Sequence, residues 1–235
     1  MSFYEYVSIA QKKENAKKSI EKLRKSNPDI SPVIVTGKTI VNTWWGRAWN
    51  KNLESYADYS NRIGRGRSYV KQGAVLHLKL KQGKISALVQ GSRAKPYSVD
   101  ICIDPLDKQR WRQITNICNR KIESLEQLIS GKFPEDLNVL FTTTKAGIFP
   151  SPKEIHFHCS CPDSASLCKH VAATLYGLGA RLDTNPLMFF EMREIEFKEL
   201  IKKSIEDKME SILKNADVQS PRGIKDEDLF DLFGV

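Results

Sequence analysis

The sequence predicts an α+β protein in which an antiparallel β-meander with flanking helices precedes a small β-hairpin and helix unit and further C-terminal helices. Residues 74–103 form three runs of alternating apolar and polar side chains, separated by glycine-containing turns, which is the pattern of antiparallel strands. Apolar residues recur with helical periodicity on both sides of this region. Three of the five cysteines lie within residues 158–170, HCSCPDSASLCKH.

Two helices are expected before the strands. Residues 12–25 carry apolar residues at helical spacing among lysines and glutamates, and Asn27-Pro28 should end this helix. Thr43 can cap a second helix that extends from residue 44 to residue 60. The apolar side of the second helix forms one continuous stripe, which favours core packing over base stacking. Its members are Trp45, Trp49, Leu53 and Tyr56.

The strands follow a segment that we expect to be a loop, residues 61–73, because Gly64 and Gly66 alternate there with arginines. Gln82-Gly83 should make the tight turn between the first two strands. Further helices are expected over residues 110–131 and 169–182 and after residue 185. Residues 134–154 contain three prolines and predict an irregular connector.

The positive charge of the chain is regional. The net charge is +9, and residues 36–101 contain twelve basic and three acidic residues, which accounts for the whole surplus. A regional basic surplus is typical of a surface that binds a polyanion such as nucleic acid, although it also fits a solvated face. The candidate nucleic-acid contacts are Arg62, Arg65, Arg67, Lys71, Lys79, Lys81, Arg93 and Lys169.

Other partner classes have no support in the sequence. The first residues lack the apolar core of a signal peptide, and no apolar run approaches the roughly 20 residues that span a bilayer. We therefore expect a cytoplasmic protein with neither a membrane nor a small-molecule substrate as its partner. In a reducing compartment, clustered cysteines bind metal more often than they form disulfides.

The cysteine cluster has the spacing C-x-C-x6-C-x-H. Side chains alternate along a strand, so Cys159 and Cys161 should point to one side while His158 points away. The intervening residues can turn the chain back, and Cys168 should then lie at a helix start with His170 in the first turn. Three thiolates and one imidazole form a closed tetrahedral set, as in structural zinc sites. The predicted ligands of one structural Zn²⁺ are Cys159, Cys161, Cys168 and His170.

Disulfide, redox and nucleophilic roles fit the cluster less well. A disulfide between Cys159 and Cys161 would have poor geometry in an extended segment. Redox pairs use C-x-x-C rather than C-x-C, and a nucleophilic cysteine needs only one thiol beside its histidine. An iron–sulfur cluster with a histidine ligand remains an alternative. Cys102 and Cys118 are isolated and are expected to be packing residues.

The cysteine and histidine spacing, with the segment that follows it to residue 190, resembles the bacterial SWIM zinc finger family. The segments TWWGRAWNKNLESYADYSNRIGRGRSYVKQG, ALVQGS and GIFPSPKEI are also similar to that family, so the resemblance covers roughly residues 33–190. It implies zinc bound by Cys159, Cys161, Cys168 and His170, and a role in binding DNA or protein. Its bacterial members are associated with Swi/Snf-type helicase-like ATPases, which implies such an ATPase as a possible partner.

Four parts of the chain are expected. Residues 1–32 form an N-terminal helix, residues 33–150 a basic α+β domain, residues 151–193 the SWIM finger with its helix, and residues 194–235 a C-terminal helix with an acidic tail. Two functions remain open: a non-catalytic nucleic-acid-binding accessory factor, with DNA favoured, or an adaptor in which the finger and C-terminal region dock a protein. An enzyme is not expected, because no G-x-x-x-x-G-K-[ST] loop occurs.

Overall fold

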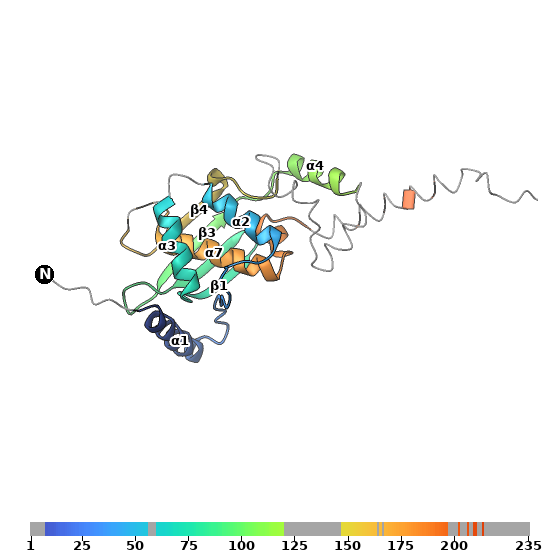
Figure 1. Cartoon of the computed structure of the whole chain (residues 1–235). Coiled ribbons are helices and arrows are strands. Elements are labelled where there is room, and N and C mark those ends of the chain that lie inside the picture. The colour runs from blue at the N-terminus through green and yellow to red at the C-terminus, as the bar shows by residue number, and fades with distance from the viewer. Residues whose placement is uncertain are drawn as a thin grey trace, which may run out of the picture. The chain divides into compact units, whose positions relative to one another are not determined.

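The fold is seen in a computed structural model (Figure 1), which describes residues 8–55, 60–119, 147–163, 165, 167–196, 202, 206, 209–210 and 213. The chain divides into two compact units, Met1–Glu196 and Phe197–Val235. The elements of the first unit are α1 (Ile9–Ser26), α2 (Trp44–Glu54), α3 (Ser60–Lys71), β1 (Val75–Lys81), β2 (Lys84–Val89), β3 (Tyr97–Ile103), α4 (Lys108–Asn119), the 3₁₀ turn η3 (Pro152–Glu154), β4 (Ile155–Cys159), α7 (Lys169–Thr184) and α8 (Met188–Met192).

The four strands form one antiparallel sheet in the order β1-β2-β3-β4. The predicted α+β class and the meander are therefore confirmed. Gln82 and Gly83 both have positive φ, 46° and 68°, so they form the expected tight turn between β1 and β2. One side of the sheet is apolar and buried, as in the cross-strand row Leu78, Ala87 and Val99. The opposite side, which we call the open face, carries polar side chains such as Lys79 and Asp100.

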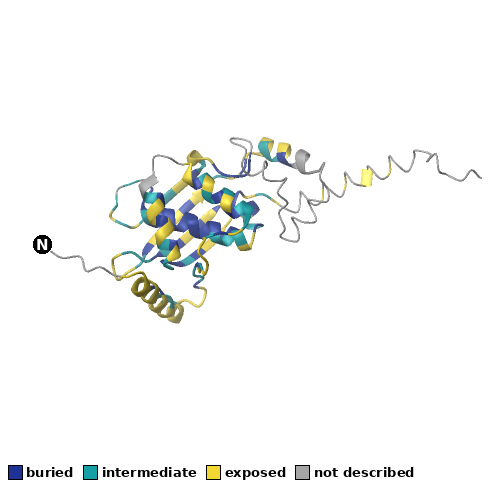
Figure 2. Cartoon of the chain, viewed as in Figure 1, coloured by how far each residue is buried: buried dark blue, intermediate teal, exposed yellow. Residues whose placement is uncertain are grey.

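Helix α7 packs on the apolar side of the sheet and is itself covered by α2 and α3. All residues from His170 to Gly179 are buried (Figure 2), because the sheet covers one side of the helix and α2 and α3 cover the other. A helix in this position must be apolar all round, which explains the composition of the segment VAATLYGLG. The core of the unit lies around α7.

Helix α2 begins where predicted, because the Thr43 hydroxyl accepts a hydrogen bond from the Gly46 backbone N–H at 3.1 Å. Asp183, at the end of α7, accepts the backbone N–H groups of Asn42 and Thr43 at 3.0 and 2.8 Å. A carboxylate at a helix N-terminus is favourable, and this one also ties α2 to α7. Trp49 of the predicted stripe is fully buried and donates its indole N–H to the Leu175 carbonyl at 3.0 Å.

Helix α1 ends at Ser26, where Asn27 is its C-cap, as the Asn27-Pro28 pair predicted. The segment that follows runs along β1: the Val33 N–H donates to the Val75 carbonyl, and the Leu78 N–H donates to the Ser31 carbonyl. These bonds satisfy the outer edge of β1, which would otherwise expose unpaired backbone groups.

The prediction of a loop at residues 61–73 is wrong, because residues up to Lys71 belong to helix α3. Gly66 lies in that helix at its contact with α7. A Cβ atom there would lie 2.7 Å from the Ala172 carbonyl carbon and 2.8 Å from the Ala173 nitrogen. The glycine therefore serves close helix packing rather than a turn.

The strand before the first two cysteines has a different partner from the one expected. We predicted a separate hairpin, but β4 pairs antiparallel with β3, with Val99 opposite Cys159. The predicted boundary at residue 150 lies between β3 and β4, so segments on both sides of it belong to one sheet. Tyr56, Cys118, most of the connector and most of the C-terminal tail lie outside the described residues or have undescribed side chains.

The turn before β4 is stabilised by a partly buried ion pair. Arg193, which is fully buried, donates to a Glu154 carboxylate oxygen at 2.5 Å, and Arg110 lies 3.4 Å from the same oxygen. Burial acts to raise the pKa of Glu154, but hydrogen bonds from Arg193 and Ser151 lower it to about 2. This cluster connects η3, α4 and the end of α8.

The second unit is described at five helical positions, and Lys202 and Glu206 form an ion pair there at 3.9 Å. Met209 and Leu213 are 60% and 65% exposed to solvent. Among the helices in the described part of the chain, none is long and apolar enough to span a membrane.

Candidate metal centre

The first two cysteines of the cluster are positioned by the end of the sheet. Cys159 is the last residue of β4 and lies opposite Val99 of β3. Pairing continues one residue further, because the Ser160 N–H donates to the Ser98 carbonyl and the Ser98 N–H donates to the Ser160 hydroxyl, both at 3.0 Å. This extension holds the backbone between Cys159 and Cys161, so both thiols lie at one end of the sheet.

The other two residues of the cluster are positioned by the start of α7. Cys168 is the N-cap residue, with extended φ and ψ of −82° and 168°, and His170 is the second residue of the helix. The structure therefore has the helix start where the C-x-H spacing indicated it. The residues between Cys161 and Cys168 connect the sheet to the helix.

The four side chains converge on one point. The ligand atoms of Cys159, Cys161, Cys168 and His170 all lie within 4.8 Å of one another. His170 Nδ1 is 3.8 Å from the Sγ atoms of both Cys159 and Cys168. Zinc bonds of about 2.3 Å to sulfur and about 2.0 Å to nitrogen give edges of roughly 3.5–3.8 Å in a tetrahedron. The donor set and its spacing fit a tetrahedral metal ion.

Burial shifts the protonation of these groups. It lowers the pKa of His170 to about 4, so the imidazole is neutral at pH 7, the form that binds a metal. Burial also raises the pKa of the Cys159 thiol and of the Cys168 thiol, although for Cys168 the backbone N–H groups of Val171 and His170 act in the opposite direction. The thiols are thus unfavourable as thiolates until a cation compensates their charge.

The His170 ring is enclosed by aromatic side chains. Its centroid lies 4.5 Å from that of Tyr97 and 5.6 Å from that of Tyr69. Gly91 completes the enclosure, because a Cβ there would lie 3.0 Å from His170 Nε2 and 2.9 Å from Tyr97 Cδ2. Sequence reasoning missed Tyr69, Gly91 and Tyr97 as neighbours of the site. No local pattern could have identified them, because each is more than 70 residues from His170.

Three of the predicted nucleic-acid contacts already have partners within the chain. Arg62 forms an ion pair with Asp163 at 2.5 Å, Arg67 pairs with Glu54, and the Lys71 ammonium donates to the Lys38 carbonyl at 2.8 Å. Tyr176 also donates to Glu54, at 2.9 Å. The hydrogen bond with Tyr176 is the largest influence that raises the pKa of Arg67. Arg67 links α3 to α2 and α7. Arg62 and Lys71 instead connect α3 to the segments that precede α7 and α2.

The remaining five candidates lie on two sides of the sheet. Lys79 and Lys81 are on the open face, where they line an open groove together with Lys84, Asp100 and Glu194. Lys169 and the loop that contains Arg93 lie beside the cysteine cluster, and Arg65 is exposed on α3. The Lys169 ammonium lies 5.6 Å from the Tyr69 ring centroid. Lys79 lies in the cross-strand row that ends at His158, whereas Cys159 lies in the neighbouring row, with Leu78. Because adjacent rows point to opposite sides of a sheet, Lys79 and Lys81 are on the face opposite the cluster.

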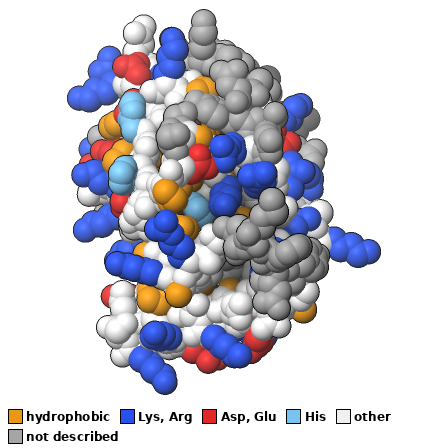
Figure 3. All heavy atoms as spheres, turned by 90° about the vertical axis from the view of Figure 1, so that its left-hand side faces the viewer, with side chains coloured by type: hydrophobic (Ala, Val, Ile, Leu, Met, Phe, Trp, Pro, Cys, Tyr) orange, Lys and Arg blue, Asp and Glu red, His pale blue; other side chains and the backbone are white. Residues whose placement is uncertain are grey.

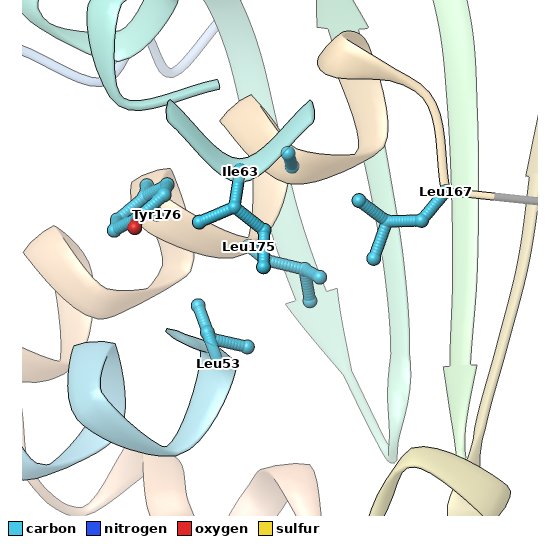
Figure 4. A pocket seen from close by; sticks show the side chains of 6 residues that line it. Leu53, Ile63, Leu167, Leu175 and Tyr176 are labelled. Carbon is cyan, nitrogen blue, oxygen red and sulfur yellow. The ribbon is translucent and has the colours of Figure 1, made fainter. Parts of the chain in front are cut away.

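A small apolar cavity lies between α2, α3 and α7 (Figure 4). It has a volume of about 10 Å³ and is lined by Leu53, Ile63, Leu167, Ala172, Leu175 and Tyr176. A space of this size holds at most one water molecule and offers it too few polar partners. This cavity is a packing defect and has no room for a ligand.

The fold and the site define an α+β protein with a closed Cys₃His cluster that can hold a metal ion. The chain is 36% identical over 167 residues to the uncharacterized protein Rv2102 of Mycobacterium tuberculosis, a match that covers 71% of this chain. The matched region spans 60% of the length of that relative. No family model matches the chain. No solved structure matches it either.

Proposed function

We propose that the protein is a zinc-binding protein of the SWIM-finger type that binds nucleic acid, preferably DNA, and catalyses no reaction. The observation that carries the proposal is the convergence of three sulfurs and His170 Nδ1 on one point. The C-x-C-x6-C-x-H spacing agrees with it. Four protein ligands leave no open position for a substrate or a catalytic water, which supports a structural role.

The residues of the cluster would connect two elements that otherwise meet only through packing. Cys159 and Cys161 stand at the end of the sheet, while Cys168 and His170 stand at the start of α7. A bound Zn²⁺ would compensate the thiolate charge and cross-link these two ends. His170 would bind through Nδ1, which faces the sulfurs, while Nε2 is directed toward Gly91.

The nucleic-acid part of the proposal is supported by charge and position. Figure 3 shows Lys and Arg side chains distributed over the side of the molecule that lies at the left of Figure 1, with Asp and Glu side chains among them. The residues 36–101 contain the whole positive surplus of the chain. Such a surface favours binding to phosphates with little dependence on sequence and with strong dependence on salt.

A second candidate function is an adaptor that docks a protein through the second unit. Met209 and Leu213 are large apolar residues that are mostly exposed there, so both side chains are available for contact with a protein partner. The resemblance suggests a Swi/Snf-type ATPase as the partner. The adaptor function is compatible with nucleic-acid binding.

The test of nucleic-acid binding is fluorescence anisotropy with labelled single- and double-stranded DNA and RNA over a salt series. We expect binding at about 50 mM salt that weakens steeply by about 200 mM, since contacts with phosphates release counterions. Lack of binding to every probe at low salt would reject the function and leave the adaptor as the better candidate.

A further inference from the structure

The segment of residues 91–96, which follows Gln90 in the connection between β2 and β3, lies against the cysteine cluster. Its first residue, Gly91, is in contact with the His170 ring, and the residue after it, Tyr97, stacks on the same ring with centroids 4.5 Å apart. At its start, the Gln90 side-chain amide donates to the Gly91 and Arg93 carbonyls at 3.3 and 2.6 Å. Both ends of the loop therefore depend on the position of His170.

This loop presents two cations to solvent. Arg93 and Lys95 are exposed, and among the described residues neither side chain forms an ion pair or a hydrogen bond. Lys169, between two residues of the cluster, lies on the same side of the domain, above Tyr69. By contrast, Arg62 and Arg67 are engaged with carboxylates, and Lys79 and Lys81 share their groove with Asp100 and Glu194.

We propose that the loop of residues 91–96, with Lys169, is the surface that binds the phosphates of nucleic acid, and that the metal centre holds this surface in place through His170. This inference rests on the proposed function and specifies where it resides. Free guanidinium and ammonium groups are available for phosphate, whereas cations already paired with carboxylates must first exchange a partner. Loop 91–96 is the place where free charge and the cluster meet.

The experiment compares two double variants of the full-length, zinc-loaded protein. Arg93→Ala/Lys95→Ala removes two charges from the loop, and Lys79→Ala/Lys81→Ala removes two from the open face of the sheet. Because both variants lose the same net charge, the comparison isolates position. All four side chains are exposed, so both variants are expected to fold like the wild type, which circular dichroism and thermal unfolding check.

The loop variant should bind nucleic acid about tenfold more weakly at low salt. The slope of log K against log salt, which is negative, should also become shallower by nearly 2 for a duplex. Each phosphate that the variant no longer neutralises reduces its magnitude by roughly 0.9. The open-face variant should lose less than about threefold in affinity. Equal decreases in affinity for both variants, or an unchanged slope in the loop variant, would overturn the assignment of the surface.

The role of the metal centre has its own measurement. Removing the metal from the wild-type protein with a chelator should weaken nucleic-acid binding, and the same treatment should cause little further loss in the loop variant, because the two changes act on one surface. If metal removal weakens nucleic-acid binding by the same factor in the loop variant as in the wild type, the coupling between the metal centre and the loop is overturned. A wild-type protein that binds no nucleic acid refutes the proposed function, whereas a wild type and loop variant of equal affinity refute only the placement of the surface.

Discussion

Gly66 of α3 lies directly against Ala172 of α7, so close that a Cβ on the glycine would be 2.7 Å from the Ala172 carbonyl carbon. Two helix backbones can approach this closely only where one of them lacks a side chain. Gly64, two residues earlier on the same helix, has no neighbour within 4 Å of its hypothetical Cβ. The two glycines of one short motif therefore have different roles.

Gly66→Ala should destabilise the protein by about 1–3 kcal/mol, since the new methyl group meets backbone that cannot rotate away. The matched change Gly64→Ala should stabilise it by about 0.5–1 kcal/mol, because alanine has the higher helix propensity and the site is open. Urea unfolding of both variants measures the difference. Similar free energies of unfolding for the two would show that α3 and α7 do not pack as described.

Gly91→Ala should weaken metal binding about tenfold or more. A methyl group at this position would meet His170 Nε2 and the Tyr97 ring, which displaces the imidazole from the sulfurs. Changes beside metal ligands typically cost about 10–100-fold in affinity. Competition with a chromogenic zinc chelator measures the effect. Ser92→Ala, at the exposed neighbouring position, is the control, and equal affinities of the two variants would contradict the described contact.

Glu154→Gln should remove a pH-dependent part of the stability. Partial burial opposes ionisation, but the hydrogen bonds from Arg193 and Ser151 lower the pKa of Glu154 to about 2 in the folded protein, from an ordinary 4.5. The stabilisation is therefore complete above about pH 4.5 and is lost as the pH falls toward 2. Chemical unfolding at about pH 5 and about pH 3 should show a smaller loss of stability in the variant than in the wild type. All other titratable groups, the cysteines included, are present in both proteins, so their contributions cancel in the comparison. Equal losses of stability in the variant and the wild type would contradict the role of Arg193.

The features predicted correctly from the sequence are those with local causes. Asn27-Pro28 ends α1, Thr43 caps α2, and Gln82-Gly83 turns β1 into β2, because each effect acts within a few residues. The convergence of the four cluster residues also follows from short spacings, namely alternation at the end of β4 and a helix start at Cys168.

The features that were missed depend on contacts between distant segments. The sequence predicts a loop in place of α3 because glycine usually marks a turn, and only the contact with Ala172 explains Gly66. The pairing of β3 with β4 joins residues that are 60 apart, such as Val99 and Cys159. The Arg193–Glu154 pair and the enclosure of His170 by Tyr69 and Tyr97 likewise have no local signature.

The metal content of the purified protein tests the central claim most directly. Elemental analysis should find about one zinc per chain in the wild type and little in Cys161→Ser, which removes one of the four converging ligands. Cys102 is exposed on the open face, so the prediction that it is a packing residue is wrong. Cys102→Ser should keep its zinc. Folded wild-type protein without metal, or the same zinc content in all three proteins, would contradict the assignment of the site.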